Sequence, residues 1–145
     1  ATAWTSGAAT ATLTCSNACP NDMIVGMVST NTATSVGAAG AAVTLTLAAP
    51  GAGLRHYITY LSINRFASAV LTAAAAPVSI TTTNLPTALA FSFEAEAAAQ
   101  GTISRWREDF ACPIAVSAQN TATTIVCPIT TGVIWRVTAG FYVAP

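Results

Sequence analysis

The sequence predicts an all-β fold: an antiparallel, jelly-roll-like β-sandwich that follows an extended N-terminal arm. Apolar and polar residues alternate with the period of a half-buried strand, most clearly in residues 133–143. Five apolar side chains share one parity there: Val133, Trp135, Val137, Phe141 and Val143. Proline and glycine turns separate such runs at intervals of about 8–12 residues, a spacing typical of sandwiches and jelly rolls.

The expected strands follow one another from the middle of the chain to its end. They cover residues 43–47, 54–66, 77–82, 89–93, 119–127 and 133–143. The run 54–66 has large side chains on both parities, so we expect both of its faces to be partly covered. The alanine-rich runs 73–76 and 94–100 are too short to be stable helices alone, and we expect at most one helical turn, at 94–100.

The chain divides into two parts of different composition. Residues 1–42 are dominated by Ala, Thr, Ser, Gly and Asn, with Asp22 as the one charge, and are predicted to form an arm. Within the arm we expect a short strand at 23–28 and a loop or extended segment at 29–40. Residues 43–145 are predicted to form the β-sandwich domain, and 145 residues are enough for one hydrophobic core.

Composition excludes several partners. Charged residues make up 7% of the chain, against roughly 25% in a typical soluble domain, and five cations balance five acids. The chain has no cluster of basic residues of the kind that binds nucleic acid, so we expect no nucleic acid partner. The uncharged stretch 66–93 is long enough to cross a bilayer, but Pro77 and Pro86 interrupt it, so we expect no membrane span. Because so little surface charge gives poor solubility, we expect other protein to cover much of the surface.

The residues of catalytic chemistry are scarce. His56 is the single histidine, and no Gly-x-Ser-x-Gly pattern accompanies it, so we expect a strand histidine at a surface or subunit contact. The acid pairs Glu94/Glu96 and Glu108/Asp109 are typical of solvated turns. No phosphate loop or dinucleotide fingerprint is present. We therefore expect no enzyme activity and no cofactor.

Four cysteines leave three interpretations open. Disulfides would join Cys112 to Cys127 across a hairpin, stabilising the fold by about 3 kcal/mol, and Cys15 to Cys19 in a small loop. Free thiols are the usual state in a reducing cytoplasm. A zinc site would use all four thiolates, although neither pair has the usual two-residue gap.

One short segment is the densest cluster of charge in the chain. Residues 105–109 read Arg-Trp-Arg-Glu-Asp and form either a solvent-facing loop or a contact point, since tryptophan and arginine dominate interface hot spots. Trp4 is a lone indole among small residues, and docking would remove it from water. The interface candidates are therefore Trp4, Arg105, Trp106, Arg107, Glu108 and Asp109.

Four stretches resemble a known class of protein: 50–59, 82–86, 118–126 and 131–138. Through them, residues 43–143 are similar to small β-sandwich virion proteins of tailed bacteriophages. The resemblance implies a capsid cement or decoration protein, made in the host cytoplasm and seated as a homotrimer on the outside of the shell formed by the major capsid protein. It implies no catalytic residue.

A phage fibre or tail-tip module that recognises a host-surface glycan is the alternative function. The same fold can serve both. Such a module needs a concave aromatic and polar platform, and aromatic residues are only 8% of this chain.

Overall fold

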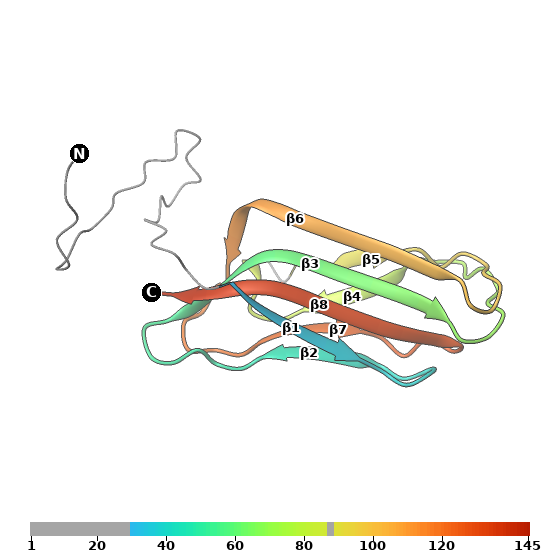
Figure 1. The fold of residues 1–145 in the computed structure, drawn as a ribbon, viewed down its shortest axis with the longest axis horizontal. Coiled ribbons are helices and arrows are strands. Elements are labelled where there is room, and N and C mark those ends of the chain that lie inside the picture. The colour runs from blue at the N-terminus through green and yellow to red at the C-terminus, as the bar shows by residue number, and fades with distance from the viewer. Residues whose placement is uncertain (1–29, 87–88) are drawn as a thin grey trace, which may run out of the picture.

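The computed structural model describes residues 30–86 and 89–145, and it confirms the all-β antiparallel sandwich (Figure 1). These described residues form eight strands: β1 (Asn31–Val36), β2 (Val43–Leu47), β3 (Arg55–Ala67), β4 (Val78–Thr82), β5 (Phe91–Phe93), β6 (Ile103–Ala115), β7 (Thr123–Cys127) and β8 (Val133–Ala144). They form two four-stranded sheets, ordered β1-β8-β3-β6 and β2-β7-β4-β5. The described part of the chain contains no helix long and apolar enough to cross a membrane.

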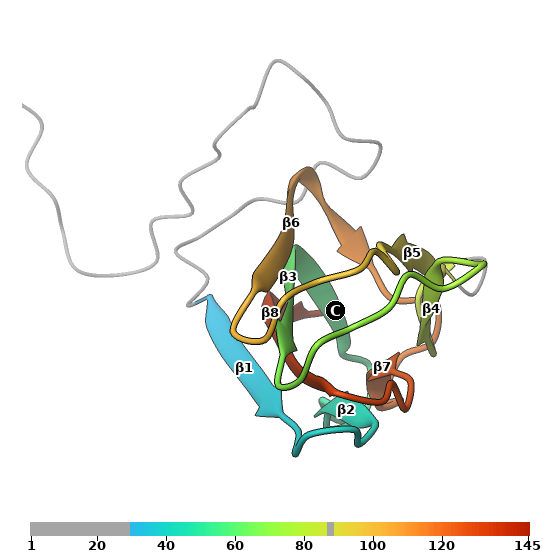
Figure 2. The ribbon, with the colours of Figure 1, turned by 90° about the vertical axis from the view of Figure 1, so that its right-hand side faces the viewer.

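The topology is that of one long hairpin wrapped around a core. Strand β4 pairs with β5, β3 with β6, β2 with β7 and β1 with β8, all antiparallel. The tip of the hairpin lies between β4 and β5. Contacts between β3 and β8 and between β4 and β7 then join the wrapped ribbon into two sheets (Figure 2). This nesting of strand pairs is the jelly roll.

The core lies between the sheets, and alternation along the strands builds it. Leu61, Ile63 and Trp135 of one sheet and Ile80 and Ile125 of the other are at most 1% exposed. Trp135 also satisfies its polar group, because the indole Nε1–H donates a hydrogen bond to the Pro128 carbonyl at 3.1 Å. Residues between the buried ones face outward, so each sheet has a core face and a solvent face.

A β-bulge at Thr59 explains the mixed pattern of the 54–66 run. Ile58 pairs with Phe141 and Tyr60 with Gly140, so β8 has no partner for Thr59. The extra residue reverses the alternation. Ile58 therefore faces the core on one side of the bulge, whereas Tyr60 faces outward on the other.

Strand β6 has a larger bulge opposite the same residue. Ile114 pairs with Ile58 and Asp109 pairs with Tyr60, so residues 110–113 stand opposite Thr59 alone. Figure 1 shows β6 bending at the end of the sheet where this segment lies. Pro113 fits there because a residue without an N–H cannot take part in a regular ladder.

Two predictions for local structure are wrong. Residues 31–36 are not a loop but strand β1, which pairs with β8 along its whole length. Small side chains allow this pairing: Ala33 packs on the core, and the Thr34 and Thr138 hydroxyls lie 3.0 Å apart. Residues 94–100 form no helical turn, because Leu71 and Ala98 exchange two backbone hydrogen bonds as an isolated bridge. The strand predicted at 23–28 lies outside the described residues.

Substituting Gly140 tests the packing beside the Thr59 bulge. A Cβ at this position would lie 2.2 Å from Cε1 of the Tyr60 ring, so we expect Gly140→Ala to lower the free energy of unfolding by about 1–3 kcal/mol. Removing the ring in Tyr60→Ala should abolish most of that penalty, whereas Tyr60→Phe should keep it. Chemical denaturation of the single and double variants measures both effects. An equal penalty in all backgrounds would contradict this packing.

Candidate functional site

His56 is buried, so the expectation of a surface or subunit contact is wrong. Its side chain is 2% exposed, and its Nδ1 lies 3.3 Å from the Thr123 hydroxyl across the sandwich. The Phe141 ring meets the imidazole edge-on, with centroids 5.4 Å apart. Burial lowers the pKa of His56, and a hydrogen bond to the Ala48 backbone partly opposes that shift. The residue is thus a neutral member of the core.

The predicted Cys112–Cys127 disulfide is also wrong. Cys127 is a free thiol buried on β7, whereas Cys112 is exposed on the β6 bulge and is disulfide-bonded. The two strands belong to different sheets, and the Cys127 side chain faces the core, so the two cysteines do not meet. Cys15 and Cys19 lie outside the described residues. Within the described ranges, no three His, Cys, Asp or Glu side chains gather as a metal site.

The charged segment 105–109 is part of strand β6 and not a loop. Alternation divides it: Arg105, Arg107 and Asp109 face outward, while Trp106 turns toward the core and packs against Phe91, with ring centroids 5.0 Å apart. Glu108 shares the parity of Trp106 but is exposed at this edge of the sheet. Trp4, the remaining interface candidate, lies outside the described residues.

Three arginines gather on the outward side of the sheet β1-β8-β3-β6. Ser62 stands between Thr138 and Arg107 in the ladder, and Asn64 stands between Arg136 and Arg105. We call this surface the arginine face; its members are Thr34, Ser62, Asn64, Arg105, Arg107, Arg136 and Thr138. The sequence showed Arg105 and Arg107 through their charge density. It did not show Arg136, whose proximity depends on the register of β3 and β8.

Tyr60 stabilises one end of the arginine face. The Arg107 guanidinium carbon lies 4.2 Å from the centroid of the Tyr60 ring, within cation–π range. Arg107 also donates two hydrogen bonds of 2.7 Å to the Asp109 carboxylate, and these bonds hold the pKa of Asp109 below its usual value. Arg107 is therefore largely neutralised. Arg105 and Arg136 have no salt-bridge partner among the described residues.

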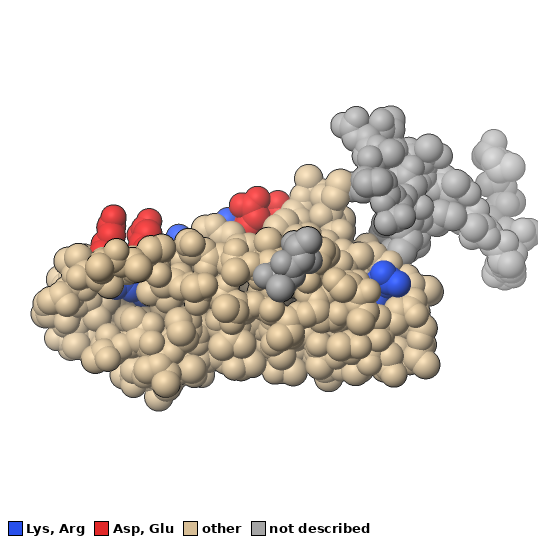
Figure 3. Space-filling view, turned by 180° about the vertical axis from the view of Figure 1, so that it is seen from behind, with Lys and Arg blue, Asp and Glu red and all other residues tan. Residues whose placement is uncertain are grey.

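The opposite sheet has a different surface. Strands β2, β7, β4 and β5 contain no Asp, Glu, Lys or Arg, and their outward positions are rich in hydroxyl groups. The Thr83 and Thr124 hydroxyls, for example, lie 2.7 Å apart. In the view from behind, charged side chains are few and the acids stand along one edge (Figure 3). All five arginines belong to β3, β6 and β8.

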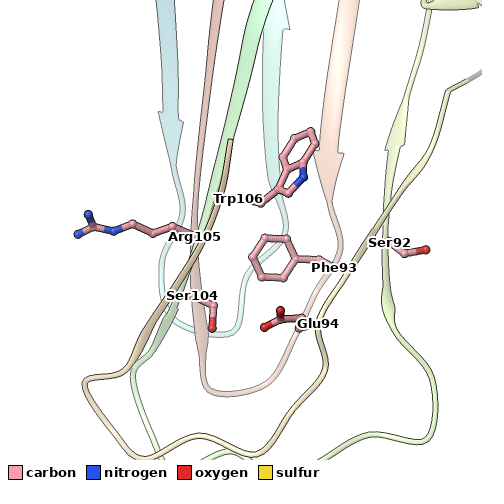
Figure 4. A pocket seen from close by; sticks show the side chains of 6 residues that line it. All are labelled: Ser92, Phe93, Glu94, Ser104, Arg105 and Trp106. Atoms are coloured by element: carbon pink, nitrogen blue, oxygen red, sulfur yellow. The ribbon is translucent and has the colours of Figure 1, made fainter. Parts of the chain in front are cut away.

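A small pocket lies where the two sheets end side by side. Strands β5 and β6 are each the last strand of their sheet. The pocket there has a volume of about 120 Å³ (Figure 4). Its lining residues are Ser92, Phe93, Glu94, Ser104, Arg105 and Trp106. Sequence reasoning assigned Glu94 to a solvated turn and did not connect it with Trp106, because only the wrapped topology brings the two together.

A scan against protein-family models finds no match for this chain, and searches of curated proteins and of solved structures find none either.

The lowered pKa of His56 makes stability depend on pH. The unfolded chain takes up a proton near pH 6.5, whereas the folded protein does so only at lower pH, so the unfolded state binds more protons between the two values. The stability contribution of neutral His56 is complete above the unfolded pKa and is lost as pH falls through the folded pKa. We expect the free energy of unfolding to decrease between about pH 7 and pH 5, and His56→Gln to remove that part of the decrease. Identical pH profiles for the two proteins would contradict the assignment.

The buried Cys127 thiol should be unreactive. Burial raises its pKa from 9.0 to about 12, which lowers the thiolate population near neutral pH about a thousandfold. Iodoacetamide at pH 8 should therefore leave Cys127 unmodified in the native protein and modify it in denaturant, as peptide mass spectrometry can measure. Rapid alkylation in the native state would show that the thiol is accessible.

Proposed function

We propose that the protein is a structural virion protein, a capsid decoration protein that binds the outside of a phage shell and stabilises it. It acts as a homotrimer seated on the major capsid protein, it is made in the host cytoplasm, and it has no enzyme activity. The observation that best supports the proposal is the arginine face, a broad surface with hydroxyl groups and two arginines that have no acid partner among the described residues.

The chemistry of the arginine face suits a protein partner. The guanidinium groups of Arg105 and Arg136 offer forked donors that match carboxylates or backbone carbonyls on a facing surface. Asn64 lies between them, and the neighbouring row of the sheet adds the hydroxyls of Thr34, Thr138 and Ser62, which can donate or accept. Arginine is enriched at protein interfaces, whereas lysine, which this chain lacks, is depleted there. The partner surface should accordingly present carboxylates.

One edge of the same sheet, strand β6, is less suited to contact. A long free edge strand invites pairing with another sheet, and bulges and charged side chains are the usual protection against it. Strand β6 has both: the bulge at 110–113 and the charged run 105–109. Attachment through the broad face is therefore favoured over strand addition at β6.

Shells offer a direct test. We expect Arg105→Ala combined with Arg136→Ala to weaken binding to shells that lack this protein by about 100-fold or more, because each hydrogen bond to a charged group contributes about 1.5–3 kcal/mol net of its exchange with water. The matched control is Val70→Ala with Ile129→Ala, two exposed side chains away from the arginine face. Co-sedimentation measures affinity, and thermal unfolding confirms that both variants are folded.

Electron microscopy of purified particles measures copy number. The proposal requires many copies distributed over the shell. A few copies at a tail or a single vertex, or equal binding by the arginine variant and its control, would contradict it.

A further inference from the structure

The pocket between β5 and β6 combines aromatic and polar walls. Phe93 is 6% exposed and meets the Trp135 ring edge-on, with centroids 5.4 Å apart, so its position is fixed by the core. Trp106, the second aromatic residue of the lining, packs against the Phe91 ring. Ser104 and Glu94 supply a hydroxyl and a carboxylate, whereas the Ser92 side chain points away from them (Figure 4). Figure 4 shows the Arg105 side chain directed away from these groups, toward the arginine face.

The loop that contains Glu94 is held in place before any ligand arrives. Nη2 of Arg65 donates a hydrogen bond of 3.0 Å to the Glu96 carbonyl from beneath the loop. From the neighbouring loop, the Ala74 N–H donates to the Ala95 carbonyl at 2.9 Å, and Leu71 pairs with Ala98. A binding group on such a fixed segment loses little conformational freedom when a ligand binds.

Charges of both signs lie around the pocket: Glu94 is negative, and Arg65 and Arg105 are positive, with the Arg105 side chain directed away (Figure 4). Arg65 is 4% exposed and stands opposite Ser104 in the β3–β6 ladder, directly beside the pocket wall. It has no carboxylate partner among the described residues, and its Nε has no hydrogen-bond partner there either. A cationic ligand would approach this guanidinium, and an anionic ligand would approach the Glu94 carboxylate. The arrangement therefore favours a neutral ligand over either ion.

We infer that this pocket binds one neutral sugar ring. The apolar C–H face of the ring would pack against Trp106 and Phe93. Its hydroxyls would donate to the Glu94 carboxylate and exchange a hydrogen bond with Ser104. The cavity of about 120 Å³ is far smaller than the roughly 300–1,000 Å³ of pockets for drug-sized ligands, so it admits a single terminal ring. The inference does not depend on the proposed function, because the pocket and the arginine face share only Arg105, whose side chain is directed away from the pocket (Figure 4).

Saturation-transfer NMR on the full chain tests the inference with glucose, galactose, mannose and N-acetylglucosamine as probes. We expect at least one of them to bind with Kd of about 1–10 mM, a usual strength for so small a contact. Glu94→Gln should weaken that binding at least tenfold. The matched control is Glu96→Gln, two residues along the same loop and outside the pocket lining, which should bind as the unaltered protein does. Ser104→Ala is the second pocket variant, and a circular dichroism melt verifies its fold.

Several results would overturn the inference. These are no saturation transfer from any of the four sugars at 50 mM (roughly ten times the expected Kd), equal effects of Glu94→Gln and Glu96→Gln, or full binding by both pocket variants. Tetramethylammonium and acetate serve as charged probes, and tighter binding of either ion than of every sugar would replace the neutral site with an ionic one. Shell binding of Glu94→Gln, measured in parallel, should be unchanged.

Discussion

The extra residue at Thr59 determines which side chains of strand β3, in the sheet β1-β8-β3-β6, face the core. On one side of it, His56 and Ile58 point inward, and on the other side Leu61 and Ile63 do. The same reversal turns Tyr60 outward over Gly140, where only glycine leaves room for the ring. Arg107 then stacks on Tyr60. The inward position of the core side chains of β3 and the outward position of Tyr60 beneath Arg107 thus both follow from one bulge. In a regular ladder, one of these two arrangements would be lost.

Strand β6 supplies two surfaces because successive side chains point to opposite sides of a sheet. Arg105 and Arg107 direct their side chains to the arginine face, while Ser104 and Trp106 line the pocket, whose lining also includes Arg105. The pocket exists because β5 and β6 end their sheets without pairing with each other. Since the two surfaces share only Arg105, substituting Arg136 or Glu94 alters one surface without the other.

Much of the fold could be predicted because the strands with one buried face alternate visibly, as Val133 to Val137 do. Strand β1 could not: its sequence, Asn-Thr-Ala-Thr-Ser-Val, has no apolar alternation, and its place beside β8 depends on small side chains and paired hydroxyls. The Cys112–Cys127 pairing failed for a related reason, since local order does not reveal which sheet a strand joins. Charge density identified Arg105 and Arg107, but Tyr60, Arg136 and Arg65 become neighbours of the candidate sites only through strand register.

Arg65 is a buried charge beside the pocket, in a chain that has few charged residues. A buried guanidinium without a carboxylate is costly, because desolvation is not offset by a nearby opposite charge. A chain with only five arginines nevertheless has one of them in this position, where it donates to the backbone of the Glu94 loop. Replacing it with an apolar residue would spare the desolvation cost but leave the Glu96 carbonyl without that donor. Arg65 therefore holds the loop that contains Glu94 in place, and an apolar residue could not do this.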